Sequence, residues 1–330
     1  MRPKKALNIY LEARANEVTE ATLQSHEYRL NHLVRWCKQE GIEDVADLDR
    51  RDLHEFRVWR REDGDLAPAS EKTQMDSVRV FIKHLERLDV VETGLHEAVV
   101  SPALSGTDKR SEDIVDHEVA EDIVEHLDKY QYASNRHVAV LLMWRAGLRT
   151  GALQSLDLTD YSSDEQYIEV TNRPDTGTRV KNGDGGERHV ALSSNVCDVI
   201  DDYITDNRHD VLDDHGRQPL VATEFGRVAK PTVRNWSYVV TQPCMMGDCP
   251  HDRDEDECRA AHSTDYPGGC PSSVAPHAWR RGSITAMLRS DVPSPIVSDK
   301  VDVSESVLDE FYDKRSSREK MEQRRRYADW

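Results

Sequence analysis

AGLRTGALQSL, at residues 146–156, is the first of four short segments that decide how this chain is interpreted. The other three are RVKNGDGGERHVAL at 179–192, PHAWRRGSITAML at 276–288 and VLDEFYDKRS at 307–316. Taken singly, the polar residues of each segment have ordinary structural explanations, such as a helix cap, a turn residue or a core aromatic. Their ordered combination instead indicates a shared site.

Hydrophobic periodicity around these segments predicts a mainly helical chain. The expected helices begin near Thr19, Asp49, Pro68, Asp116 and Ser134, and a further helix covers 193–208. Alternation of apolar and polar residues predicts short strands at 166–172, 178–182 and 187–193, with a turn at 182–186. The remainder is expected to be helical, except for residues 243–273. The fold class expected is therefore mainly α with one small antiparallel β-sheet (α+β).

The length of 330 residues favours two domains. Residues 1–100 are expected to form a small helical domain. The small, polar and charged residues 101–113 are the best candidate for a linker. Residues 114–330 then form the second domain, with a Cys-, Asp- and Gly-rich insertion at 243–273.

The charge balance is strongly acidic, with a net charge of −18. The chain contains 36 Asp, 26 Glu and 32 Arg but only 12 Lys, a composition that resembles the proteins of halophiles. Taken alone, such a charge argues against a nucleic-acid partner, unless the acidic surface is an adaptation to salt. Residues 1–110 have a net charge of only −3, which suits a face that meets an anion.

No run of 18 apolar residues is present, so no transmembrane helix is expected. The first residues lack the apolar stretch of a signal peptide, so we expect a cytoplasmic protein. Six cysteines are too few for a secreted disulfide scaffold of this length.

Four of the six cysteines lie within 27 residues, among Asp, Gly and Pro residues that would not build a core. Four thiolates, or three with a histidine, suit a structural zinc ion. The candidate ligands are Cys244, Cys249, Cys258 and Cys270, with His251 or His262 as possible replacements for one of them. The alternative is a flexible loop with reduced thiols. Cys37 and Cys197 lie on apolar helix faces and are expected in the core.

Together, the four segments resemble the tyrosine recombinases, the phage integrase family of DNA strand-exchange enzymes, and in particular the branch of salt-loving archaea. The family pattern has Gly-Leu-Arg at a helix start, a lysine on a β-turn, His-x-x-Arg at a second helix start and a tyrosine some 30 residues later. The matching positions are Arg149, Lys181, His277, Arg280 and Tyr312. The resemblance implies a helical, SAM-like core-binding domain followed by a catalytic domain.

The resemblance implies a site-specific recombinase that cleaves and rejoins duplex DNA through a covalent 3′-phosphotyrosine. Tyr312 would be the nucleophile, so no ATP is needed. Arg149 and Arg280 would clamp the nonbridging oxygens, because planar guanidinium groups suit phosphate. Lys181 would protonate the leaving 5′-oxygen, and His277 would donate to the phosphate or handle the tyrosine proton. These groups replace a catalytic metal.

Two positions depart from the family pattern. Ala152 stands where the family often has Glu, and Val303 stands where it usually has His or Trp. Asp302 and Lys300 are candidates to compensate. These departures support one alternative, a zinc-braced DNA-binding regulator or excision factor without activity. The second alternative is a nicking and closing enzyme that resembles the type IB topoisomerases.

A basic segment at the C-terminus contrasts with the acidic chain. Residues 314–326 contain seven Lys or Arg and two Glu. A solvated final helix explains this pattern as well as a contact with DNA phosphate or with a neighbouring protomer. Since family members commonly exchange C-terminal helices, the resemblance implies a homo-oligomer on duplex DNA, from a dimer to a tetrameric synapse.

Overall fold

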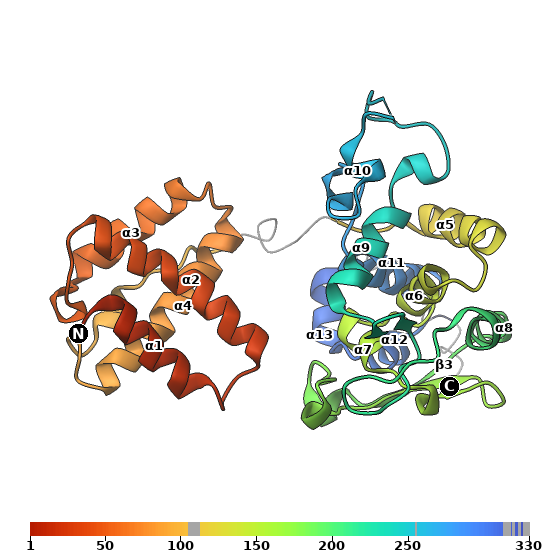
Figure 1. The fold of residues 1–330 in the computed structure, drawn as a ribbon, viewed down its shortest axis with the longest axis horizontal. Coiled ribbons are helices and arrows are strands. Elements are labelled where there is room, and N and C mark those ends of the chain that lie inside the picture. The colour runs from red at the N-terminus through yellow and green to blue at the C-terminus, as the bar shows by residue number, and fades with distance from the viewer. Residues whose placement is uncertain (105–112, 255, 313–317, 319–320, 323–324, 326–330) are drawn as a thin grey trace. The chain divides into compact units, whose positions relative to one another are not determined.

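The computed structural model describes residues 1–104, 113–254, 256–312, 318, 321–322 and 325. The chain forms two compact units, residues 1–111 and 112–330 (Figure 1). Each unit has its own hydrophobic core. Most of the expected linker, and residues 314–326 apart from the few described, lie outside the described residues.

The N-terminal unit is a bundle of four helices, α1 (Pro3–Arg14), α2 (Glu20–Gln39), α3 (Arg50–Asp63) and α4 (Pro68–Arg87). The Thr19 hydroxyl accepts a hydrogen bond from the backbone N–H of Thr22 and caps α2, while Asp49 and Asp52 form a reciprocal capping box on α3. The predicted starts of these helices are thus confirmed. Helix α1, which was not predicted from the sequence, buries Leu7 and Tyr10 in the core.

The C-terminal unit is built around one buried helix. Its helices are α5 (His117–Tyr130), α6 (Asn135–Trp144), α7 (Thr150–Ser155), α8 (Ser194–Asp202), α9 (Lys230–Val240), α10 (Arg259–His262), α11 (Pro276–Arg289), α12 (Ser294–Val301) and α13 (Glu305–Val307). Every residue from His137 to Trp144 is buried, because α6 is surrounded by α5, α9 and α11 (Figure 1). A helical turn at Leu308–Tyr312 follows α13.

The unit also contains a small antiparallel sheet of β1 (Tyr161–Ser162), β2 (Tyr167–Val170) and β3 (Arg188–Ala191). Ile168 pairs with Val190, and both side chains are buried against the core. The observed class, mainly α with antiparallel β-structure, is the one that the sequence predicted.

The strand expected at 178–182 was wrong. The chain turns twice there, since Gly177 has φ +75°, and Asn182 and Gly183 have φ +101° and +57°. Only Thr178 makes a β-bridge, to Arg173. Lys181 therefore lies on a turn between two tight bends.

The sequence also predicted helix for the residues between 208 and the start of α9, and this prediction was wrong. Residues 208–229 are mainly irregular and include a second antiparallel pair, β4 (Ala222–Thr223) and β5 (Gly226–Arg227). The Asp213 carboxylate accepts hydrogen bonds from the backbone N–H groups of His215 and Arg217, and Gly216 has φ +73°. This local turn competes with a helix.

Candidate active site

Arg149 is presented by a tight turn between α6 and α7. Gly147 has φ +63°, and a Cβ atom there would lie 2.8 Å from Cγ1 of Val301, so a side chain would clash. Arg149 is the N-cap residue of α7, and its side chain is partly exposed. Because Gly147 has no side chain, the turn can pack directly against the end of α12.

Arg280 lies one turn into α11 and is almost completely buried. Its guanidinium group donates hydrogen bonds to the carbonyl oxygens of Gly147, at 2.5 Å, and Val301. Burial, followed by the neighbouring Arg149 charge, lowers the pKa of Arg280 to about 9. Arg280 therefore still carries its charge at neutral pH and joins the α7 turn to the end of α12.

Three consecutive carbonyl groups at the end of α12 each accept a hydrogen bond from a different arginine. The Lys300 oxygen accepts from Nε of Arg188 at 2.8 Å, and the Val301 oxygen accepts from Arg280. The Asp302 oxygen accepts from Nη2 of Arg149 at 2.6 Å. The last carbonyls of a helix lack intrahelical partners and carry its negative dipole end, so they suit cationic donors. The end of α12 thus gathers three guanidinium groups.

Asp302 also uses its side chain. Its backbone is left-handed, with φ +52°, which Asp tolerates better than most residues. Oδ2 accepts a hydrogen bond from Nη1 of Arg149 at 2.5 Å, and Oδ1 accepts one from Nδ2 of Asn182 at 2.8 Å. Asn182 follows Lys181, whose side chain is exposed. The lysine turn is therefore tied to Arg149 through one carboxylate.

His277 begins α11 beside these cations. Partial removal of water, followed by the charges of Arg281, Arg280 and then Arg149 and Lys181, lowers the pKa of the imidazole below its usual value. His277 is therefore neutral at neutral pH. A neutral imidazole can accept a proton, whereas an imidazolium cannot.

Tyr312 is half-buried at the end of the turn Leu308–Tyr312. It packs against a small apolar cluster that includes Leu288, Val301 and Leu308. Tyr312 interacts electrostatically with Arg280 and raises the pKa of that arginine, whereas burial lowers it. The cluster therefore joins the tyrosine to the two helices, α11 and α12, that carry or hold the arginines.

The five residues singled out in the sequence thus come from α7, the lysine turn, α11 and the turn after α13. Arg280 interacts electrostatically with Arg149 and Tyr312, and His277 with Arg149, Arg280 and Lys181. The sequence analysis missed Asn182 as a contact of Asp302, and Arg188 as a clamp. Arg188 also donates to the Gly186 carbonyl at 2.8 Å, and so joins the lysine turn to α12. Its place within the lysine segment 179–192 was the only available signal.

The two departures from the family pattern are apolar contacts in this chain. Ala152 is buried in the main core, and Val303 packs against the small cluster beneath Tyr312. Neither side chain offers a hydrogen bond to a phosphate. Polar contacts around Arg149 and Arg280 come instead from the end of α12, from Asp302 and from the Gly147 carbonyl.

The four insertion cysteines are not arranged as a metal site. Among the described residues, no group of three or more His, Cys, Asp or Glu side chains is placed to hold a metal ion. Cys270 is buried, while Cys244, Cys249 and Cys258 are partly exposed. Nε2 of His251 lies 2.9 Å from the Ser272 hydroxyl. The zinc ion expected from the sequence therefore stays a prediction.

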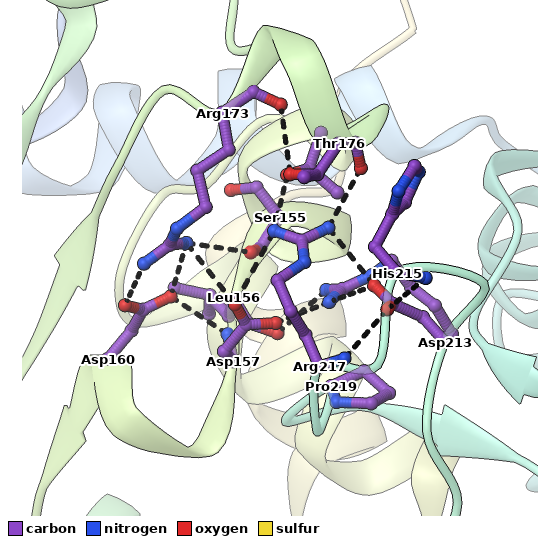
Figure 2. Close-up of polar contacts among 12 residues, drawn as sticks. Ser155, Leu156, Asp157, Asp160, Arg173, Thr176, Asp213, His215, Arg217 and Pro219 are labelled. Carbon is purple, nitrogen blue, oxygen red and sulfur yellow. Dashed lines mark hydrogen bonds and ion pairs between the residues drawn. The ribbon is translucent and has the colours of Figure 1, made fainter.

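A buried network of ion pairs lies at the C-terminal end of α7 (Figure 2). Arg173 donates to Asp160 at 2.5 Å, and Arg217 donates to Asp213 at 3.0 Å and to the Thr176 carbonyl at 2.9 Å. Arg227 pairs with both Asp157 and Asp213, and its Nη1 donates to the carbonyl oxygens of Gln154 and Leu156. The network fixes the end of α7 to the loops that precede the lysine turn and β4.

Comparison with known protein families agrees with this architecture. Residues 113–242 match the model of the phage integrase family, and residues 8–88 match that of the phage integrase N-terminal SAM-like domain. The chain belongs to the phage integrase family, the tyrosine recombinases. No curated protein matches the chain.

Solved structures share the fold. The Tn1549 transposon integrase, in complex with circular intermediate DNA, has a TM-score of 0.66 at 14% identity, over 98% of this chain and 100% of that one. A lambda integrase dimer bound to a COC′ core site has a TM-score of 0.63 at 12% identity, over 96% and 100% of the two chains. In the described part of the chain, no helix is long and apolar enough to cross a membrane.

Proposed function

We propose that the chain is a site-specific DNA recombinase that cleaves and rejoins duplex DNA through a 3′-phosphotyrosine at Tyr312. The observation that carries this proposal is the gathering of Arg149 and Arg280 at the end of α12, with His277 and Tyr312 beside them. Family membership supports the same activity.

Cleavage begins when the Tyr312 oxygen attacks the scissile phosphorus in line. A P–O(Tyr) bond forms and the P–O5′ bond breaks, so the fragment that ends in the 3′-phosphate stays on the enzyme and the other fragment leaves with a 5′-hydroxyl. Neutral His277 accepts the phenol proton or donates to a nonbridging oxygen, and Lys181 supplies a proton to the leaving 5′-oxygen. Rejoining reverses these steps, so the energy of the broken bond is conserved without ATP.

The two arginines stabilise the negative charge that develops on the phosphorane. Their guanidinium groups are already oriented by the carbonyl oxygens of Gly147, Val301 and Asp302, so little reorganisation is needed when the phosphate enters. This chain's own cations supply the stabilisation that a metal supplies elsewhere.

Duplex DNA is the proposed partner, as it is for the integrases of similar fold. The proposal includes a homo-oligomer on the DNA, from a dimer to a tetramer. In the C-terminal unit, a hollow of about 680 Å³ is lined by residues of α5, α6 and α8, which include the acidic Glu121, Glu125 and Asp128, together with the basic Arg145 and with Lys300 of α12.

The structural zinc ion remains a proposal from the sequence alone, with Cys244, Cys249, Cys258 and Cys270 as ligands. The test is metal analysis of protein purified without chelator, compared with a Cys249→Ser/Cys258→Ser variant. One zinc per wild-type chain, lost in the variant, supports the site. Absence of zinc from both proteins excludes it.

A nicked suicide substrate tests the proposed activity, because loss of the short cleaved strand traps the covalent complex. The wild-type protein is expected to form an adduct that resists denaturation, and Tyr312→Phe to form none while still binding the duplex. Strand exchange between two sites then distinguishes a recombinase from a topoisomerase. DNA binding by the wild-type protein without any adduct would indicate the regulator that Ala152 and Val303 favour.

A further inference from the structure

The Asp302 carboxylate lies between two parts of the site that are far apart in the sequence. Oδ2 is 2.5 Å from Nη1 of Arg149 and 3.0 Å from Nδ2 of Asn182, and Oδ1 is 2.8 Å from the same Nδ2. The Asp302 side chain is only 15% exposed. Hydrogen bonds to a partly buried carboxylate are stronger than those between neutral surface groups, so this bridge fixes geometry.

The backbone of the lysine turn needs such support. Asn182 has φ +101°, outside the left-handed region that non-glycine residues normally use. Its side-chain amide, which donates to Asp302, holds the residue in that conformation. A Cβ atom on Gly186 would lie 3.5 Å from Oδ2 of Asp302, so the turn packs directly against the carboxylate.

We propose that Asp302 and Asn182 are positioning residues that hold Lys181 in register with Arg149. This inference rests on the proposed function, in which Lys181 protonates the leaving oxygen and Arg149 holds the phosphate. Asp302 binds both the arginine and the residue next to the lysine. The proton donor and one arm of the phosphate clamp are thus fixed as a single assembly. Ala152 and Val303 supply no such link.

A change of leaving group isolates this role. When sulfur replaces the bridging 5′-oxygen of the scissile phosphate, the leaving thiolate needs no proton, since a thiol is far more acidic than an alcohol. A defect in proton donation then disappears, whereas a defect in phosphate binding or folding remains. Single-turnover cleavage of matched oxygen and sulfur suicide substrates is the measurement.

The variants are chosen to preserve the backbone. Asn182→Gly and Asp302→Gly retain positive φ and remove only the side-chain contacts. Gly185→Ala is the matched control in the same turn, because a Cβ atom there meets nothing within 4 Å. Lys181→Ala sets the pattern expected for loss of the proton donor. Asp302→Asn retains an acceptor for Arg149 and is the conservative rescue.

Asn182→Gly is expected to slow cleavage of the oxygen substrate by about 10- to 100-fold, and to cleave the sulfur substrate within about threefold of wild type. Asp302→Gly is expected to lose more of the cleavage rate on the oxygen substrate, because Arg149 is also released. The sulfur substrate should restore only part of that rate. The cleavage rate of Asp302→Asn should approach that of the wild-type protein. Equal loss on both substrates by Asn182→Gly, or no loss on either, would overturn the inference. A wild-type protein that forms no adduct on either substrate would instead overturn the proposed function.

Discussion

Arg280 has a structural role in the fold and a proposed role in the chemistry. Its buried guanidinium group satisfies two backbone carbonyls from separate elements and keeps a positive charge beside Tyr312. An always-charged, planar donor suits both tasks, whereas lysine is a point charge with fewer directed hydrogen bonds. The family pattern is therefore most informative about single residues.

Removal of either arginine should lower cleavage strongly. We expect Arg149→Ala and Arg280→Ala each to reduce the single-turnover cleavage rate by about 100-fold or more, the usual loss for one transition-state donor. Lysine should restore little at either position. Binding to the uncleaved duplex and thermal unfolding are the controls, because Arg280→Ala also leaves two buried carbonyls unpaired. A properly folded alanine variant within a few-fold of wild type would show that the arginine is structural.

The depressed pKa of His277 gives a pH dependence with a definite sign. If neutral His277 is needed for proton transfer, cleavage should be constant down through pH 6.5, the ordinary histidine pKa, and fall only at lower pH. Protonation also opposes folding, so stability linked to His277 is full above pH 6.5 and is lost as the pH falls through the lower, folded-state pKa. A cleavage profile that rises as the pH falls below 6.5 would contradict a neutral His277. His277→Gln is the control, since it removes the titrating group.

At the scale of elements, the structure depends on contacts that no local pattern reveals. The helix starts at Thr19 and Asp49 were predictable because caps are local in sequence. The pairing of Arg227 with Asp157, 70 residues away, was not, and neither was the convergence of Arg149, Arg188 and Arg280 on α12. The strand expected at 178–182 failed for a local reason, since two left-handed residues end it. The sequence thus predicted the candidate reacting groups and missed the contacts that hold them.

The ion network at the C-terminal end of α7 should contribute to stability in an acid-sensitive way. The Arg227 and Arg217 contacts hold the pKa of Asp213 well below its usual value. Its contribution is therefore full above about pH 4 and is lost as the pH falls through the lower, folded-state pKa. Arg227→Met leaves two buried carboxylates short of a partner, and should destabilise the C-terminal unit by about 3–5 kcal/mol.

Thermal and denaturant unfolding measured across pH would check this prediction. The matched control is Arg51→Ala, which breaks an exposed pair with Glu55 and should change stability far less than Arg227→Met does. If Arg227→Met and Arg51→Ala have equal effects, the network is not a stabilising element.

At the scale of the whole molecule, the acidic charge determines which interactions the proposed binding of duplex DNA depends on. The net charge of −18 and the excess of Arg over Lys favour contacts through oriented guanidinium groups over general attraction. Each neutralised phosphate adds about −0.9 to the slope of log K against log salt, and counterion release is a weaker driving force in concentrated salt. A protein with this composition must therefore rely on a few directed contacts and on DNA shape.

Specific DNA binding should consequently persist in molar salt, with a shallow slope. Affinity for a cognate duplex, measured from about 0.5 to 3 M KCl, would test this, with a scrambled duplex as the control. Loss of all specific binding above about 1 M would show that simple electrostatic attraction dominates.

The identity of the covalent linkage tests the central claim most directly. The trapped protein–DNA adduct is digested with protease and nuclease, and the modified peptide is sequenced by mass spectrometry. A single nucleotide joined through its 3′-phosphate to Tyr312 is expected. A linkage to another residue, such as Tyr327 outside the described residues, or a 5′-phosphate linkage at Tyr312, would contradict the central claim.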